Sequence, residues 1–212
     1  VKIGEMTDAV KWLRRMAELS ISPDLASFNA VINACTKHGS AQQAAEWLQQ
    51  MVISTIPADA VSYTTVIDAY ARGGNCKEAA LWLEQMAGNR VSPDAFSYNA
   101  IITAYVRLGD VAEATRWVAC MTSARVQPDN VTFNTIIDCF AKKGNTGQAS
   151  LWLDEMRASA LKPDTISYTA VIDACAKRGA SAEAIEWLEK MLEATVEPDE
   201  ISYTSVIDSY AK

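Results

Sequence analysis

The chain has 212 residues, of which 50% are hydrophobic and 21% are charged, and its formal net charge is −7 at pH 7. This acidic total argues against a protein that holds polyanions by diffuse positive charge alone, although it leaves room for a local basic stripe. The longest apolar stretches are far shorter than the roughly 20 residues that a membrane span needs, so no span is predicted.

The sequence repeats itself every 35 residues without insertion or loss. The segment at 27–30 returns at 62–65, 97–100, 132–135, 167–170 and 202–205. A fixed period of this size is typical of a solenoid, in which one supersecondary unit stacks on copies of itself. The predicted organisation is a partial repeat at 1–24, complete repeats at 25–59, 60–94, 95–129, 130–164 and 165–199, and a partial repeat (first helix) at 200–212. Both ends lie within a repeat, which suggests a piece of a longer protein.

Each repeat is predicted to open with an amphipathic helix. We expect this helix to begin near the Ser or Thr at repeat position 3, because these residue types favour the N-cap. Apolar residues follow at positions 4, 7, 8 and 11, the spacing of one helix face. A glycine at position 15 is expected to end the helix, because glycine adopts the left-handed conformation at low cost. These glycines are Gly39, Gly74, Gly109, Gly144 and Gly179.

A second helix is predicted to follow the glycine, opening with a capping box in several repeats, as in Ser40 with Gln43. Its apolar stripe of Ala, Trp, Leu and Met recurs in register, and at helical spacing this stripe is expected to be core. The tryptophans are Trp12, Trp47, Trp82, Trp117, Trp152 and Trp187. A proline before the final Asp is expected to stop the helix. The fold predicted is therefore all-α, a right-handed superhelical solenoid of about six helix–turn–helix repeats.

These features together resemble the pentatricopeptide repeat (PPR): 35 residues, Ser/Thr-Tyr/Phe-Asn/Thr in the first helix, Gly between helices, Ala and Met in the second helix, and a final Pro-Asp. The uniform repeat length resembles the P class of that family, and the resemblance covers essentially the whole chain. Tetratricopeptide repeats run 34 residues and carry a different opening. The resemblance implies single-stranded RNA binding, one base per repeat, in a mitochondrion or chloroplast, with a role in RNA processing, stability or translation.

The resemblance also implies which residues read the bases, namely repeat positions 5 and 35. Position 5 holds Asn29, Thr64, Asn99, Asn134, Thr169 and Thr204. Position 35 holds Asp24, Asp59, Asp94, Asp129, Asp164 and Asp199. In the family's code Asn with Asp favours U and Thr with Asp favours G, so the five complete pairs read 5′-UGUUG-3′. A competing interpretation is that Asn, Thr and Asp merely suit helix starts and turns.

Two further positions carry expected RNA contacts. Position 2 is mostly apolar and is expected to sandwich bases: Ala26, Val61, Phe96, Val131, Ile166 and Ile201. Position 13 is always basic and is expected to meet phosphates: Lys37, Arg72, Arg107, Lys142, Lys177 and Lys212. Cations also suit helix C-termini, and an Asp four residues earlier in several repeats favours ion pairs that would partly neutralise this stripe.

No catalytic residue, metal site or cofactor is predicted, and the chain is not expected to be an enzyme. The five cysteines form no CxxC motif, and His38 alone cannot complete a usual zinc set. The aspartates recur once per repeat, at an expected spacing of ~10 Å, too far apart for two-metal chemistry at ~4 Å. The alternative function is a structural scaffold that binds other proteins of an organellar ribonucleoprotein or membrane complex. The acidic total and the partly neutralised stripe favour that alternative.

Overall fold

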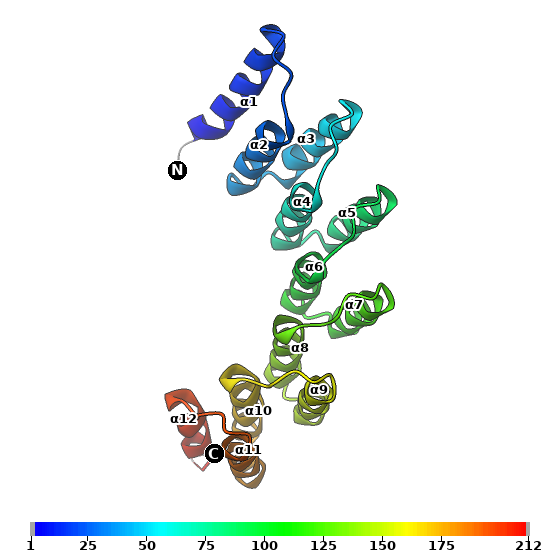
Figure 1. Cartoon of the computed structure of the whole chain (residues 1–212). Helices are drawn as coiled ribbons and strands as arrows, with labels where there is room; N and C mark the ends of the chain where they lie inside the picture. The colour runs from blue at the N-terminus through cyan, green and yellow to red at the C-terminus, as the bar shows by residue number, and fades with distance from the viewer. Residues whose placement is uncertain (1–2, 211–212) are drawn as a thin grey trace. The chain divides into compact units, whose positions relative to one another are not determined.

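The computed structural model describes residues 3–210, which form twelve α-helices and no strand and divide into two compact units (Figure 1). Unit 1 covers 1–108 and unit 2 covers 109–212. The helices of unit 1 are α1 (Ile3–Glu18), α2 (Leu25–Lys37), α3 (Ala41–Ile53), α4 (Ala60–Arg72), α5 (Cys76–Gly88) and α6 (Ala95–Arg107). Those of unit 2 are α7 (Val111–Ser123), α8 (Asn130–Lys142), α9 (Thr146–Ala158), α10 (Thr165–Lys177), α11 (Ser181–Glu193) and α12 (Glu200–Ser209).

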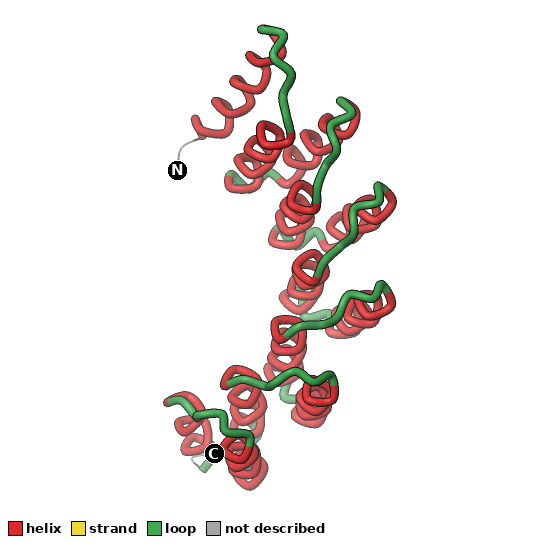
Figure 2. Tube along the Cα trace, viewed as in Figure 1, coloured by secondary structure: helices red, strands yellow, loops and turns green. Residues whose placement is uncertain are grey.

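Each unit is a stack of helical hairpins joined by short loops (Figure 2). The first helices of successive repeats pack directly on one another: α2, α4 and α6 in unit 1, and α8, α10 and α12 in unit 2. Within each unit, the second helices α3, α5, α9 and α11 each pack against the first helix of their own repeat and that of the next, as α9 does with α8 and α10. Within the described part of each unit, the backbones of the second helices do not contact one another. The predicted helix–turn–helix solenoid is confirmed.

The N-cap of each first helix from α2 to α12 lies three residues earlier than predicted. This cap is the Asp at position 35, whose extended backbone precedes the helix and whose carboxylate accepts the backbone N–H of the Ser or Thr at position 3. These six bonds measure 2.8 to 3.0 Å. The Ser or Thr is therefore the third helical residue rather than the cap, and in α4, α8, α10 and α12 its hydroxyl completes a capping box.

The predicted glycine ends of the first helices are confirmed. Gly39, for example, has φ +79°, and the N–H groups of Gly39 and Ser40 bond the carbonyls of Thr36 and Cys35, which is the Schellman arrangement. The second helices end in the same way, but on a residue with a side chain. Thr55, Arg90, Arg125, Ala160 and Thr195 all have φ between +57° and +62°.

These left-handed residues correct the role assigned to proline. The prolines lie in the loops, several residues beyond the last helical residue, so they do not stop the second helices. The predicted capping boxes at the start of these helices are also only half formed. Ser40, Asp110 and Asn145 accept the expected backbone N–H, but the side chain of Asn75 makes no capping bond.

Core packing is centred on the methionine and aromatic positions of each repeat. The methionine of the second helix is fully buried in all five complete repeats: Met51, Met86, Met121, Met156 and Met191. In the four repeats whose two helices lie in the same unit, the tryptophan packs against the aromatic ring at position 4 of its own repeat, with centroids 6.0 Å apart for Phe133 and Trp152 and 6.5 Å apart for Tyr168 and Trp187. Trp12 is an exception to the predicted core, because it is 72% exposed.

None of the helices within 3–210 combines the length and hydropathy needed to cross a lipid bilayer.

Candidate nucleic-acid interface

Four carboxylates at position 35, those of Asp24, Asp59, Asp164 and Asp199, are ionised hydrogen-bond acceptors at neutral pH, because their pKa values are lowered. Burial on its own would raise the pKa of Asp59 and of Asp164, but hydrogen bonds outweigh it and hold both pKa values below the ordinary 3.8. The donors are the serine of the same helix and the asparagine of the preceding repeat. The pKa of Asp24 and that of Asp199 are also lowered, first by the hydroxyl of the neighbouring serine.

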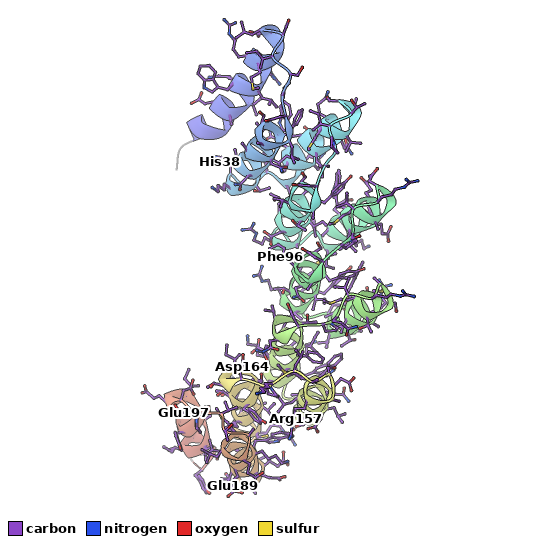
Figure 3. All side chains as sticks on the ribbon, in the orientation of Figure 1. His38, Phe96, Arg157, Asp164, Glu189 and Glu197 are labelled. Atoms are coloured by element: carbon purple, nitrogen blue, oxygen red, sulfur yellow. The ribbon has the colours of Figure 1, made fainter. Side chains whose placement is uncertain are left out.

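In two of the predicted base-reading pairs, the asparagine and the aspartate of the pair are in direct contact. The side-chain nitrogen of Asn134 lies 3.2 and 3.3 Å from the two carboxylate oxygens of Asp164. In unit 1 the nitrogen of Asn29 lies 3.4 Å from Asp59 Oδ1. Figure 3 shows Asp164 at the start of α10, one repeat beyond the helix that carries Asn134. The 30-residue separation in sequence is thus closed by stacking of adjacent repeats.

The two threonine pairs differ from the asparagine pairs and from each other. The Thr64 hydroxyl donates to the carbonyl oxygens of its own helix, 2.8 Å from Ala60 and 3.2 Å from Val61, and no bond joins it to Asp94 within the described part of unit 1. The Thr169 hydroxyl instead lies 2.7 Å from the hydroxyl of Ser202, which lies 2.7 Å from Asp199 Oδ1. Thr169 therefore reaches its aspartate through a serine.

Four other predicted base-reading residues do not belong to a pair whose two members lie in the same unit. Asn99 is buried at the start of α6 in unit 1, whereas Asp129 caps α8 in unit 2. Asp24 and Thr204 belong to the terminal partial repeats, where each supplies half of a pair. Both lie at a helix start, Asp24 as the cap of α2 and Thr204 in the first turns of α12.

The apolar residues at position 2 are exposed although they sit next to the capped helix starts. Val61 and Phe96 are each 60% exposed in unit 1, and Phe96 projects from the start of α6 in Figure 3. In unit 2 the exposed fractions are 57% for Val131, 65% for Ile166 and 62% for Ile201. Ala26, the small member of the set, is also exposed. One apolar side chain per repeat is thus free to contact a flat ring.

Ion pairs occupy three of the five predicted phosphate-binding cations that the structure describes. Arg72 pairs with Asp68, Lys142 Nζ lies 2.7 Å from Asp138, and Lys177 Nζ lies 2.5 Å from Asp173. The hydrogen bond that Lys142 donates to Asp138 raises the pKa of Lys142. Lys37 and Arg107 make no ion pair with the described residues, because position 9 of their repeats is Asn33 and Thr103. The last member, Lys212, lies outside the described residues.

Other reactive side chains do not assemble into a site within residues 3–210. No three residues among His, Cys, Asp and Glu lie close enough there to hold a metal ion. Burial raises the pKa of the Cys35, Cys139 and Cys175 thiols, that of Cys175 to about 11, so these thiols are protonated at neutral pH.

Comparison with protein families identifies the class of protein that this geometry defines. A model described as the PPR repeat family matches residues 23–72, 58–99, 93–142, 128–177 and 163–212. A second model, described as the pentatricopeptide repeat domain, matches 1–38. The two together cover the chain from end to end, so the chain belongs to the pentatricopeptide repeat family. No curated protein sequence matches the chain.

Solved structures share the fold. The chain superposes on PPR10 from maize with a TM-score of 0.74 and 25% sequence identity, over 93% of this chain and 28% of that one. For PPR10 in complex with an 18-nt psaJ RNA element the TM-score is 0.55 and the identity 21%, over 98% and 36% of the two chains. The PPR domain of Arabidopsis thaliana protein-only RNase P 1, in complex with tRNA, matches with a TM-score of 0.71 and 14% identity, over 89% and 99%. The chain thus spans well under half the length of either PPR10 chain.

Proposed function

We propose that this chain binds single-stranded RNA, reading one base per repeat. The observation that carries the proposal is the recurring arrangement at the helix starts of each unit. There an exposed apolar residue at position 2 lies next to a polar position 5 side chain and an ionised Asp, as in Val131, Asn134 and Asp164. Apolar side chains stack against bases of any identity, while polar side chains distinguish base edges by hydrogen bonds.

The proposed target sequence is 5′-UGUUG-3′, with the N-terminus toward the 5′ end. It follows from Asn with Asp selecting U and Thr with Asp selecting G, as in the family. PPR10, a relative of similar fold, is known bound to RNA. A site of action in a mitochondrion or chloroplast, and a role in RNA processing, stability or translation, are part of the same proposal and rest on the family resemblance.

The proposed role is binding without catalysis by the repeats themselves. The PPR domain of protein-only RNase P 1, also a structural relative, belongs to an enzyme and is known in complex with tRNA. A PPR array can thus accompany a catalytic domain elsewhere in a protein. In this chain the aspartates that could attract metal ions are engaged as helix caps, one per repeat.

The test is equilibrium binding of short RNA oligomers containing UGUUG, against the same oligomers with U and G exchanged, over a salt series. Specific readout predicts tighter binding of UGUUG at every salt concentration. Affinity should fall with salt according to the number of phosphates neutralised. Equal affinity for the two oligomers would contradict base readout, and an absence of binding at low salt would contradict RNA binding as a whole.

A substitution tests the register of the readout. Thr64→Asn should move the preference at the second base from G to U, because it converts a Thr and Asp pair into an Asn and Asp pair. The matched control is Thr64→Ser, which keeps the hydroxyl and should keep the preference for G. If the preference moves at a different base, the assignment of repeats to bases is wrong.

The ion pairs of the basic stripe favour a second candidate function, a scaffold that binds other proteins of an organellar complex. Arg72, Lys142 and Lys177 are partly neutralised, which weakens attraction to a polyanion. The salt series separates the two candidates, because a scaffold predicts no RNA binding even at low salt. If that complex is a membrane complex, this chain would contact its proteins without inserting into the membrane.

A further inference from the structure

Four of the predicted base-reading pairs have both members in the same unit. In three of these pairs a buried serine contacts the position 5 side chain. Ser62 Oγ is 2.7 Å from Asn29 Oδ1, Ser167 Oγ is 2.6 Å from Asn134 Oδ1, and Ser202 Oγ is 2.7 Å from Thr169 Oγ1. Each serine occupies position 3 of the following repeat, and each is 0% exposed. Because water cannot reach these hydroxyls, their protons are shared only with the protein groups around them.

The asparagine pairs show what the serine does to an amide. Ser62 Oγ lies 2.7 Å from Asn29 Oδ1 and 2.8 Å from Asp59 Oδ1, while Asn29 Nδ2 faces the same carboxylate. A flipped amide would place its carbonyl oxygen against an ionised carboxylate, so two acceptors would face each other and the serine would face an N–H. The serine and the aspartate thus fix one amide orientation. One Nδ2 proton is used on the aspartate, and the other is left as a donor for a ligand.

The pair of Thr169 and Asp199 has a serine at the same position, but here the position 5 side chain becomes an acceptor instead of a donor. Ser202 has one proton and two neighbours at 2.7 Å, the Asp199 carboxylate and the Thr169 hydroxyl. An amide oxygen can only accept, so Ser62 must give its proton to Asn29 Oδ1, but a threonine hydroxyl can donate, so Ser202 is free to make the stronger bond to the ionised carboxylate. Thr169 must then donate its own proton to Ser202, which leaves Thr169 Oγ1 as an acceptor toward a ligand.

We propose that the serine at position 3 of the following repeat is a third positioning residue wherever it contacts position 5, at Asn29, Asn134 and Thr169, and that it makes the asparagines donors and the threonine an acceptor toward the base. This inference rests on the RNA-binding function proposed above. Its chemistry agrees with the code, because uracil presents the acceptors O2 and O4 whereas guanine presents the donors N1–H and N2–H₂.

The chain contains its own control, the pair of Thr64 and Asp94. Ser97 occupies the same position and donates to Asp94 at 2.7 Å, whereas the Ser62 proton goes to Asn29 Oδ1, with Ser62 Oγ still 2.8 Å from Asp59 Oδ1. Thr64, however, bonds the carbonyls of its own helix instead of Ser97. Removal of the Ser97 hydroxyl therefore disturbs the helix cap without touching the position 5 side chain.

The experiment compares Ser62→Ala with Ser97→Ala in RNA competition binding. Ser62→Ala is expected to reduce the preference for U over C at the first base by about 5- to 10-fold, because the amide loses one of the two groups that fix its orientation. Ser97→Ala should leave the preference at the second base unchanged within about twofold, since an equal loss of capping does not reach Thr64. Ser62→Thr, which restores a hydroxyl of the kind that Thr132 supplies, should restore the preference at the first base.

A readout without RNA separates failure of this inference from failure of the proposed function. In the free protein, the side-chain amide resonances of Asn29 should report one hydrogen-bonded orientation, which Ser62→Ala loses and Ser97→Ala keeps. If these resonances do not respond to Ser62→Ala, or if both alanine variants reduce base preference alike, the serine is only a helix-capping residue. If the resonances respond as expected but the wild-type protein prefers no base, the RNA readout is wrong and the positioning contact stands.

Discussion

The buried hydroxyl of Tyr168 offers a test of the packing in which removal of a polar atom should stabilise the protein. This side chain is 0% exposed, and its hydroxyl has no hydrogen-bond partner among residues 3–210. A buried polar group without a partner costs about 1–3 kcal/mol. Tyr168→Phe removes that group and keeps the ring packed on Trp187, so we expect a gain of about 1 kcal/mol. In a chain of this size such a gain raises Tm by about 2–4 °C.

Tyr63 is the matched control, because it occupies the same repeat position with its hydroxyl satisfied. Asn89 Nδ2 donates to the Tyr63 hydroxyl at 2.9 Å. Tyr63→Phe breaks this bond and should destabilise by about 1 kcal/mol, so the same substitution has opposite signs in two repeats. The corresponding partner position of Tyr168 is Ala194, which ends its helix with φ −76° and ψ 4°, close to the −86° and 14° of Asn89. Ala194→Asn should therefore stabilise the protein with Tyr168 present and have no such effect on Tyr168→Phe.

Thermal unfolding followed by far-UV circular dichroism measures the global effect. Because repeat arrays need not unfold in one step, amide hydrogen exchange in α4 and α10 measures the local free energies as well. Equal destabilisation by the two Tyr→Phe substitutions would show that the Tyr168 hydroxyl has a partner, and would refute the reasoning.

Four other expectations concern the caps and the basic stripe. Asp164→Ala should lower the free energy of unfolding in urea by about 1–2 kcal/mol. Asp164→Asn keeps an N-cap acceptor and should lower it by less than half as much. The pKa values of Asp59 and Asp164 are lower in the folded state than the ordinary 3.8, so the stability that they contribute is fully present above pH 3.8 and is lost as the pH falls through their folded pKa values. The urea concentration at the unfolding midpoint should therefore stay constant from pH 7 to pH 5 and decrease below pH 4. Thr195→Gly, at φ +57°, should raise Tm by relieving about 1 kcal/mol of left-handed strain, and a lower Tm would contradict that assignment. Asp138→Asn should free Lys142 and tighten RNA binding about 2- to 5-fold at low salt; weaker binding would mean that Lys142 does not meet phosphate.

Features that depend on sequence spacing alone could be predicted. The period gave the number and pairing of the helices, and glycine at position 15 gave the ends of the first helices, because few other residues adopt a left-handed backbone at low cost. The ion pairs of Asp138 with Lys142 and of Asp173 with Lys177 followed from their separation of four residues on one helix face.

The helix starts could not be placed to the residue, because Asp and Ser are both strong N-cap types and they lie three positions apart. Only the backbone distinguishes them: Asp59 is extended, whereas Ser62 is already helical. The ends of the second helices were missed for a related reason. They lie at Thr55, Arg90 and their equivalents, whose residue types do not signal a left-handed conformation.

The hydrogen bonds of the candidate site could not be predicted from the sequence. Thr64 and Thr169 occupy the same position beside the same residue type, yet one bonds its own helix and the other bonds Ser202. A threonine hydroxyl chooses between such partners by rotamer, and packing around the side chain decides that choice. The serine at position 3 was recognised only as a helix-start residue, since its second contact is made to a residue 33 positions away.

Asp59 and Asp164 each serve two neighbouring repeats at once, and this dual role separates the position that holds the stack from the position that can vary. Asp59 holds the first turn of α4 and also the amide of Asn29 in the repeat before it. Any replacement therefore weakens a helix and disturbs a neighbouring site together. Position 5 has no part in ending or starting a helix, so it can alternate between Asn and Thr while the stack is preserved. Each step of the array thus combines a constant aspartate with a position 5 residue that can change without rebuilding the stack.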